Sequence, residues 1–161
     1  PFLKKEQMGL HTDVLELPHT NLILLDTGKR GTMEGKQLDW LEQQLDKHTD
    51  KPALVFAHFN PLPNRGVRPI RGMRDGEVLL KILAQRKHAK AYIHGHTHEW
   101  QHSKTGSIEI IGQPAVSYYF GKGHAHGWID MKLSEKSADL ELYCIDATHS
   151  QHGEQKQIPF R

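Results

Sequence analysis

Three short apolar runs, separated by segments with helical periodicity, constrain the fold of this chain more than any other feature. The runs span residues 21–25, 53–57 and 89–93. Each is continuous in apolar character, as in strands that are covered on both faces. Residues 36–48 carry one apolar stripe, and residues 75–88 begin with an Asp that can cap a helix and then show a second apolar face. Strand, helix and strand in this order predict parallel strands joined by a crossover.

The pattern changes in the second half of the chain. Short runs with strand character are separated by Gly, Ser and Lys, which predicts antiparallel strands. These runs are residues 107–111, 115–120, 128–133 and 140–145. Residues 146–161 are polar and unpatterned, so we expect a loose tail there. The two halves together predict an α/β fold of the α+β sandwich type, with one domain unit over residues 1–145 and a polar tail over residues 146–161.

Size and charge set broad limits on partners. The 161 residues suit one domain, and the balance of 21 Lys and Arg against 19 Asp and Glu gives no reason to expect nucleic acid or an anionic membrane as the main partner. No apolar run approaches the roughly 18 residues of a spanning helix. Cys144 lies in a stretch where apolar residues alternate, so we expect it to be a small buried side chain outside any disulfide. A free thiol of this kind suits a cytoplasmic location. The chain begins with Pro-Phe-Leu, without Met, so we expect that the natural protein starts elsewhere.

Histidines gather where two of the predicted strands end. The chain has 13 His, of which His58 follows the run 53–57, and His96 and His98 follow the run 89–93. The carboxyl ends of adjacent parallel strands meet at one edge of a sheet, where ligands bind. A single His after a strand is more often a core or loop residue than a ligand. Three imidazoles from two such loops, however, predict a site for a divalent metal ion.

The sequence around these histidines resembles a known family. Residues 54–58, followed by Pro61, and residues 93–98, Ile-His-Gly-His-Thr-His, are similar to the last two sequence blocks of the calcineurin-like metallophosphoesterases. The helix that contains residues 39–45 resembles the bacterial branch with the cyclic-nucleotide phosphodiesterases. The resemblance covers roughly residues 20–120 and implies half of a four-layer αββα fold with mixed sheets, with residues 1–145 as the C-terminal part of the domain.

The resemblance also implies an activity and a division of the metal ligands. Members of this family hydrolyse phosphate mono- and diesters with two divalent ions, for which Mn, Fe, Zn and Ni all remain open. Carried over, His58 and His96 bind one ion and His98 binds its neighbour. The earlier family motifs Gly-Asp and Gly-Asn-His are absent, and no Asp-x-His follows a predicted strand. We therefore expect this chain to supply part of a binuclear site, to be inactive alone, and to have the missing N-terminal half of the domain, or a second copy of itself, as a partner.

Substrate contacts are expected in the loop that follows His58. Arg65, Arg68, Arg71 and Arg74 recur at every third position, and in an extended segment with three residues per turn they share one face. We assign Arg65, Arg68 and Arg71 to the binding of the phosphate ester, together with Asn60, which stands where the family often has Pro. A solvated loop remains the alternative for the arginines.

Two further interpretations stay open. His124 and His126 lie in a short Gly-rich stretch and allow a second metal site, although an exposed turn is favoured there. The rival to the enzyme is a non-catalytic binding or structural module, in which the three histidines hold one metal ion or none.

Overall fold

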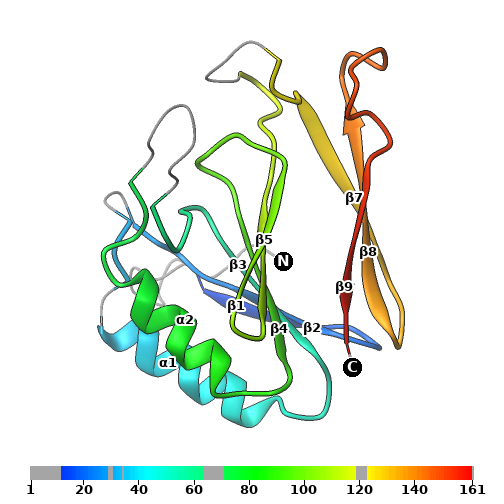
Figure 1. Ribbon diagram of the computed structural model, residues 1–161. Coiled ribbons are helices and arrows are strands. Elements are labelled where there is room, and N and C mark those ends of the chain that lie inside the picture. Colours follow the sequence, from blue (N-terminus) through cyan, green and yellow to red (C-terminus); the bar gives the residue numbers. More distant parts are fainter. Residues whose placement is uncertain (1–11, 29–30, 34, 64–70, 119–122, 161) are drawn as a thin grey trace.

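Two sheets and a layer of helices form the computed structural model (Figure 1). The structure describes residues 12–28, 31–33, 35–63, 71–118 and 123–160. One apolar core lies between the helices and the larger sheet, and a second core lies between the two sheets. The predicted α/β class with a mixed sheet is confirmed.

The larger sheet has six strands in the order β1-β2-β3-β4-β6-β5. Its strands are β1 (Asp13–Glu16), β2 (Asn21–Leu24), β3 (Ala53–Ala57), β4 (Ala89–His94), β5 (Gln101–Thr105) and β6 (Ile108–Gly112). The four central strands, β2, β3, β4 and β6, run parallel, and β1 and β5 pair antiparallel at the two edges. The predicted parallel pairing of the three apolar runs is therefore confirmed. The expectation that 107–111 joins only antiparallel strands is wrong, because β6 also pairs parallel with β4.

Two helices cover one face of this sheet. They are α1 (Gly35–Lys47) and α2 (Gly76–Ala84). Leu41 and Leu45 of α1 and Leu79 of α2 are fully buried against the sheet. Asp75 precedes α2 as predicted but makes no capping bond with its side chain. Its Oδ2 instead accepts a hydrogen bond from the backbone N–H of Met33 at 2.7 Å, which ties the loop before α1 to the start of α2.

A smaller antiparallel sheet covers the other face of the larger one (Figure 1). Its order is β7-β8-β9, with β7 (Gly127–Leu133), β8 (Ser137–Cys144) and β9 (Gln155–Pro159). The expected loose tail over residues 146–161 is wrong for β9, which pairs with β8 over five residue pairs. Ile158 and Phe160 are the reason, because both side chains are buried between the sheets in a segment that is otherwise mostly polar.

Three further segments differ from what the sequence predicted, namely β1, β5 and residues 115–118. Strand β1 and strand β5 were not expected, since β5 is a mostly exposed, polar edge strand without an apolar signature. The run 115–120 forms no named strand over its described residues 115–118, where an isolated bridge joins Ala115 to His126. Neither of the two described helices is long and apolar enough to cross a membrane.

Candidate functional site

His58 and His96 come together at one edge of the larger sheet. His58 directly follows β3, and His96 lies two residues after the end of β4, the parallel neighbour of β3. Their ring centroids are 5.2 Å apart, with planes at 74°. The backbone N–H of Gly95 donates to the carbonyl oxygen of His58 at 3.1 Å, so the two loops are held directly against each other. The predicted meeting of these two histidines at the carboxyl edge agrees with this geometry.

The turn that carries His96 and His98 has an unusual backbone. His96 has φ of 60° and His98 has φ of 57°, both in the left-handed region. Residues other than Gly are uncommon there, and holding one costs on the order of 1–3 kcal/mol. Thr97 between them is 1% exposed. The chain therefore has two strained positions, one on each side of Thr97, in the segment predicted to bind metal, and such strain clusters at functional sites.

Two aromatic side chains pack against the histidines. The Phe59 ring lies 4.1 Å from the His96 ring and 5.2 Å from the His58 ring, measured between centroids. Tyr118 meets the His98 ring edge-on at 4.8 Å. Sequence reasoning missed both residues. Phe59 carried a signal as the neighbour of His58, whereas Tyr118, twenty residues beyond His98, carried none.

Burial lowers the pKa of two histidines of this segment, His94 and His96. Burial lowers the pKa of His96, and the nearby His58 and His98 lower it further. Burial lowers the pKa of His94 to about 4, and His58 and His96 add to this effect. His94 Nδ1 lies 2.9 Å from the Gly95 carbonyl oxygen, so the neutral ring carries its proton on Nδ1. A neutral imidazole has a free nitrogen lone pair and is the form that binds a metal ion.

Of the four predicted substrate residues, the structure describes Asn60 and Arg71. Arg65 and Arg68 lie outside the described residues, and Arg71 is exposed. Asn60 is only 2% exposed, and its Nδ2 donates to the carbonyl oxygen of Leu62 at 2.5 Å. Asn60 thus lies below the surface and lines a separate cavity of about 240 Å³.

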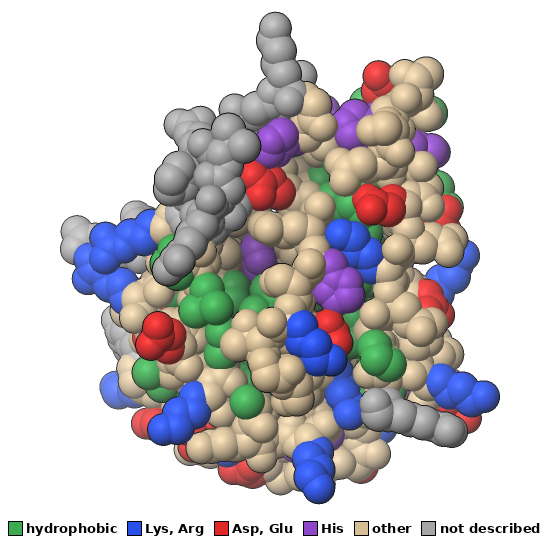
Figure 2. Space-filling view, in the orientation of Figure 1, with side chains coloured by type: hydrophobic (Ala, Val, Ile, Leu, Met, Phe, Trp, Pro, Cys, Tyr) green, Lys and Arg blue, Asp and Glu red, His purple; other side chains and the backbone are tan. Residues whose placement is uncertain are grey.

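His124 and His126 are the other histidines for which the sequence allowed a metal site. Figure 2 shows His side chains gathered over the upper half of the molecule. His124 Nδ1 lies 3.9 Å from a carboxylate oxygen of Glu99, and His126 precedes β7. Among the described residues, no three or more His, Cys, Asp or Glu side chains are arranged around a common metal position. The structure thus provides no support for a second metal site at His124 and His126. The same finding means that His58, His96 and His98 do not form a complete ligand shell for one ion.

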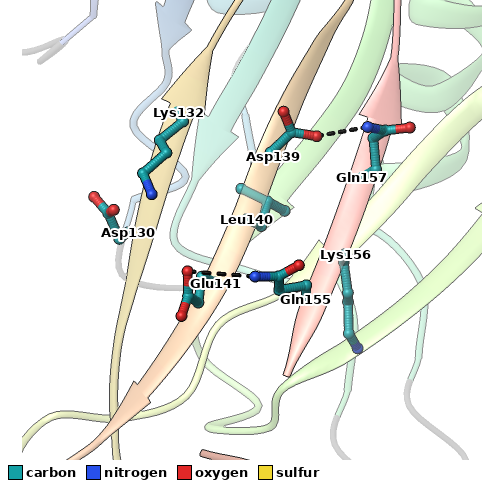
Figure 3. A pocket seen from close by; sticks show the side chains of 8 residues that line it. All are labelled: Asp130, Lys132, Asp139, Leu140, Glu141, Gln155, Lys156 and Gln157. Atoms are coloured by element: carbon teal, nitrogen blue, oxygen red, sulfur yellow. Dashed lines mark hydrogen bonds between the residues drawn. The ribbon is translucent and has the colours of Figure 1, made fainter. Parts of the chain in front are cut away.

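A hollow of about 380 Å³ lies on the outer face of the small sheet and contains none of the predicted site residues. Figure 3 shows its side chains in two rows across the strands. Gln157 donates to Asp139 at 2.6 Å, and Gln155 lies 3.5 Å from Glu141. Acidic, basic and amide side chains mix on this open surface, which has the character of a solvated sheet face.

A family model and several known proteins match this chain. The model of the calcineurin-like phosphoesterase family matches residues 5–100. A 3',5'-cyclic adenosine monophosphate phosphodiesterase, CpdA, of Haemophilus influenzae is 28% identical over 124 residues, which cover 74% of this chain and 45% of the relative. The glycerophosphodiester phosphodiesterase GpdQ of Enterobacter lignolyticus is 31% identical over 103 residues, which cover 60% of this chain and 37% of the relative.

A solved structure shows the same fold. A dimetal phosphatase from Danio rerio superposes with a TM-score of 0.71 at 15% identity, covering 94% of this chain and 61% of that one.

The chain spans less than half the length of the two relatives CpdA and GpdQ. The match to the family model extends over more than half of the sequence and includes both histidine loops. By this match, and in agreement with the resemblance seen in the sequence, the chain belongs to the calcineurin-like phosphoesterase family.

Proposed function

We propose that the protein of which this chain is part hydrolyses phosphate mono- or diesters with bound divalent metal ions, and that His58, His96 and His98 are among the ligands. One observation carries the proposal. The rings of His58 and His96 lie 5.2 Å apart, on loops that leave adjacent parallel strands at the same edge. The names of the relatives, a cyclic-nucleotide phosphodiesterase and a glycerophosphodiester phosphodiesterase, favour a diester as the substrate class.

The donor set fits a divalent transition metal in part. Imidazole nitrogen suits Zn, Mn, Fe or Ni, and the lowered pKa of His96, caused first by burial, favours the neutral ligand form. In the proposed division, His58 and His96 hold one ion and His98 holds the other. Because no group of three ligating side chains occurs among the described residues, the remaining ligands belong, in this proposal, to a segment of the parent protein outside this chain.

The chain's own residues shape the site. When bound, the metal ions would supply a water of lowered pKa and stabilise charge on the phosphoryl oxygens. Phe59 covers one face of the His96 ring and limits the approach of water from that side. Tyr92 donates its O–H to the carbonyl oxygen of Phe59 at 2.8 Å and fixes this loop on the sheet. Arg71, exposed in the same loop, is proposed to bind the phosphate group of the ester.

We propose that the missing N-terminal half of the domain covers a surface next to His58. Next to His58, a hollow of about 330 Å³ runs over the sheet face that the small sheet leaves open, with Leu24, Phe56 and Ile93 on its floor. We assign this surface to the N-terminal half of the same domain, with a second copy of the chain as the alternative occupant. A cytoplasmic location belongs to the same proposal and rests on the buried free thiol of Cys144.

A comparison of the chain with its full-length parent tests the proposal. Each is loaded with Mn²⁺ or Zn²⁺ and assayed with bis(4-nitrophenyl) phosphate and 3',5'-cyclic AMP. We expect turnover by the parent and little or none by the chain alone. Metal binding without turnover by the parent would favour the rival, a non-catalytic metal-binding module. Equal turnover by the chain and the parent would refute the shared site.

A further inference from the structure

Several large apolar side chains are exposed in the part of the chain that the structure describes, and one of them lies at the candidate metal site. They are Leu15, Val78, Val116, Tyr118, Trp128 and Ile145. Tyr118 is 58% exposed, and its ring centroid lies 4.8 Å from that of His98, a proposed metal ligand. Tyr118 therefore offers an aromatic surface to whatever binds beside His98.

Phe59, the other aromatic side chain at the site, contributes to the interior instead. It packs against the core between the helices and the larger sheet. A Cβ at Gly31 would lie 2.9 Å from Phe59 Cδ1, so the backbone of the preceding loop covers part of the ring. The rings of His58 and His96 cover more of it. The surface of Phe59 is thus used within the chain, whereas most of Tyr118 faces solvent.

The contact between Tyr118 and His98 leaves room for a second ring. The two ring planes meet at 70°, an edge-on arrangement. In such an arrangement the edge of one ring meets the other ring, so His98 covers at most one face of Tyr118. The remaining face can stack on a planar group, and aromatic pairs attract one another beyond the gain from buried area.

We propose that Tyr118 is a substrate-contacting residue that selects phosphate esters with a planar aromatic group close to the phosphorus atom. The inference rests on the proposed function, in which an ion on His98 helps to hold the phosphoryl group. Because Tyr118 packs against His98, the organic group of an ester held there comes within reach of the tyrosine ring. A small alkyl group at the same place covers less apolar surface and gains less from the contact.

Calorimetric titration of the Zn²⁺-loaded full-length parent with phenylphosphonate and methylphosphonate tests the proposal. Both probes present the same phosphonate group to the metal ions, both resist hydrolysis, and they differ in the aromatic ring. We expect the wild type to bind phenylphosphonate about fivefold or more tightly than methylphosphonate. Tyr118→Ala should reduce this preference to less than about twofold and leave the Kd of methylphosphonate within about twofold of the wild-type value.

Two further variants separate the ring of Tyr118 from other effects. Tyr118→Phe retains the ring and should retain the preference for phenylphosphonate. Trp128→Ala removes a different exposed ring, which stacks on Tyr143 in the small sheet, and should keep the wild-type Kd for both probes. Circular dichroism of each variant verifies that it is folded.

Two results would overturn the inference while leaving the proposed metal site in place. One is an unchanged preference for phenylphosphonate in Tyr118→Ala. The other is an equal weakening of both probes, as expected if Tyr118 only supports His98 or packs against the N-terminal half of the domain. A wild type that binds neither probe would contradict the proposed metal site, and this inference with it.

Discussion

His96 and His98 combine a strained backbone with a proposed role as metal ligands. Gly is the residue that adopts a φ near 60° without steric cost, yet the chain places imidazoles at both positions. Stability alone would favour Gly or Asn there, which agrees with the proposed role of the imidazoles as metal ligands. The burial of Thr97 and the hydrogen bond from the Gly95 N–H to the carbonyl oxygen of His58 anchor this turn.

The loop after β3 approaches Gly76 so closely that no side chain fits at this position. A Cβ at this position would lie 1.7 Å from the carbonyl oxygen of Pro61, three residues after His58. We expect Gly76→Ala to lower the free energy of unfolding by about 1–3 kcal/mol, because backbone must move to make room. Thermal or urea unfolding of the purified chain measures this.

Gly35 provides the matched control for that substitution. It also begins a helix, α1, but no atom lies within 4 Å of the Cβ that an Ala would add. Gly35→Ala should leave stability unchanged or raise it by up to about 1 kcal/mol, since Ala is the better helix former. An equal loss of stability in the two variants would mean that the close approach at Pro61 is not what constrains Gly76.

At the scale of elements, the β5–β6 hairpin is stabilised by a cluster of three charged or titratable side chains. Glu109 of β6 accepts hydrogen bonds from Lys104 Nζ and His102 Nε2 of β5, both at 2.7 Å. Burial raises the pKa of Glu109, but the bonds and charges of Lys104 and His102 outweigh it and lower the pKa below its usual value of 4.5. The ionised carboxylate therefore stabilises the folded hairpin.

This cluster predicts a dependence of stability on pH. Because the pKa of Glu109 is lower in the folded state, its contribution is complete above about pH 4.5 and is lost as pH falls through the folded-state value. Glu109→Gln should lower the free energy of unfolding at pH 7 by about 1 kcal/mol, and the gap from wild type should shrink between pH 5 and about pH 3. Urea titrations across this range measure the gap. The exposed Glu135→Gln is the control, and a gap of the same size at every pH would contradict the account.

The elements that sequence reasoning predicted are those with a strong apolar signature. Strands β2, β3 and β4 and both helices bury continuous or striped apolar residues, and their bounds fall within a few residues of the expected ones. Strands β1, β5 and β9 lack a long apolar run and pair at sheet edges, so their pairing partners decide their structure. Periodicity within a short window does not contain that information.

The residues of the candidate site also divide into those that the sequence predicted and those that it did not. His58, His96 and His98 were predicted because they directly follow apolar strands, which fixes the edge where they lie. The contacts of Phe59 and Tyr118 with them depend on the paths of loops and were not predicted. Asn60 was expected among the substrate contacts, but the close approach of Gly72 and Gly76 to residues 61–63 accompanies its burial beside a separate cavity.

At the scale of the whole molecule, the two sheets stabilise each other through the core between them. Ile158 of β9 is fully buried in that core, in the segment that sequence reasoning expected to be a loose tail. Ile158→Ala should lower the free energy of unfolding by about 2–4 kcal/mol through lost burial and a residual cavity. The exposed Gln155→Ala on the same strand should change it by less than about 0.5 kcal/mol. Equal effects in urea denaturation would show that β9 does not contribute to the core.

In the proposed hydrolase, metal binding and turnover require His96 at the edge of the larger sheet. The full-length parent carrying His96→Ala is compared with the wild type and with His19→Ala, which removes an exposed imidazole from the loop before β2. Metal content is measured by mass spectrometry, and turnover is measured with a phosphodiester in the presence of Mn²⁺. We predict that His96→Ala lowers bound metal and reduces kcat/KM by about 100-fold or more, whereas His19→Ala matches the wild type. Wild-type metal content and turnover in His96→Ala would contradict the assignment.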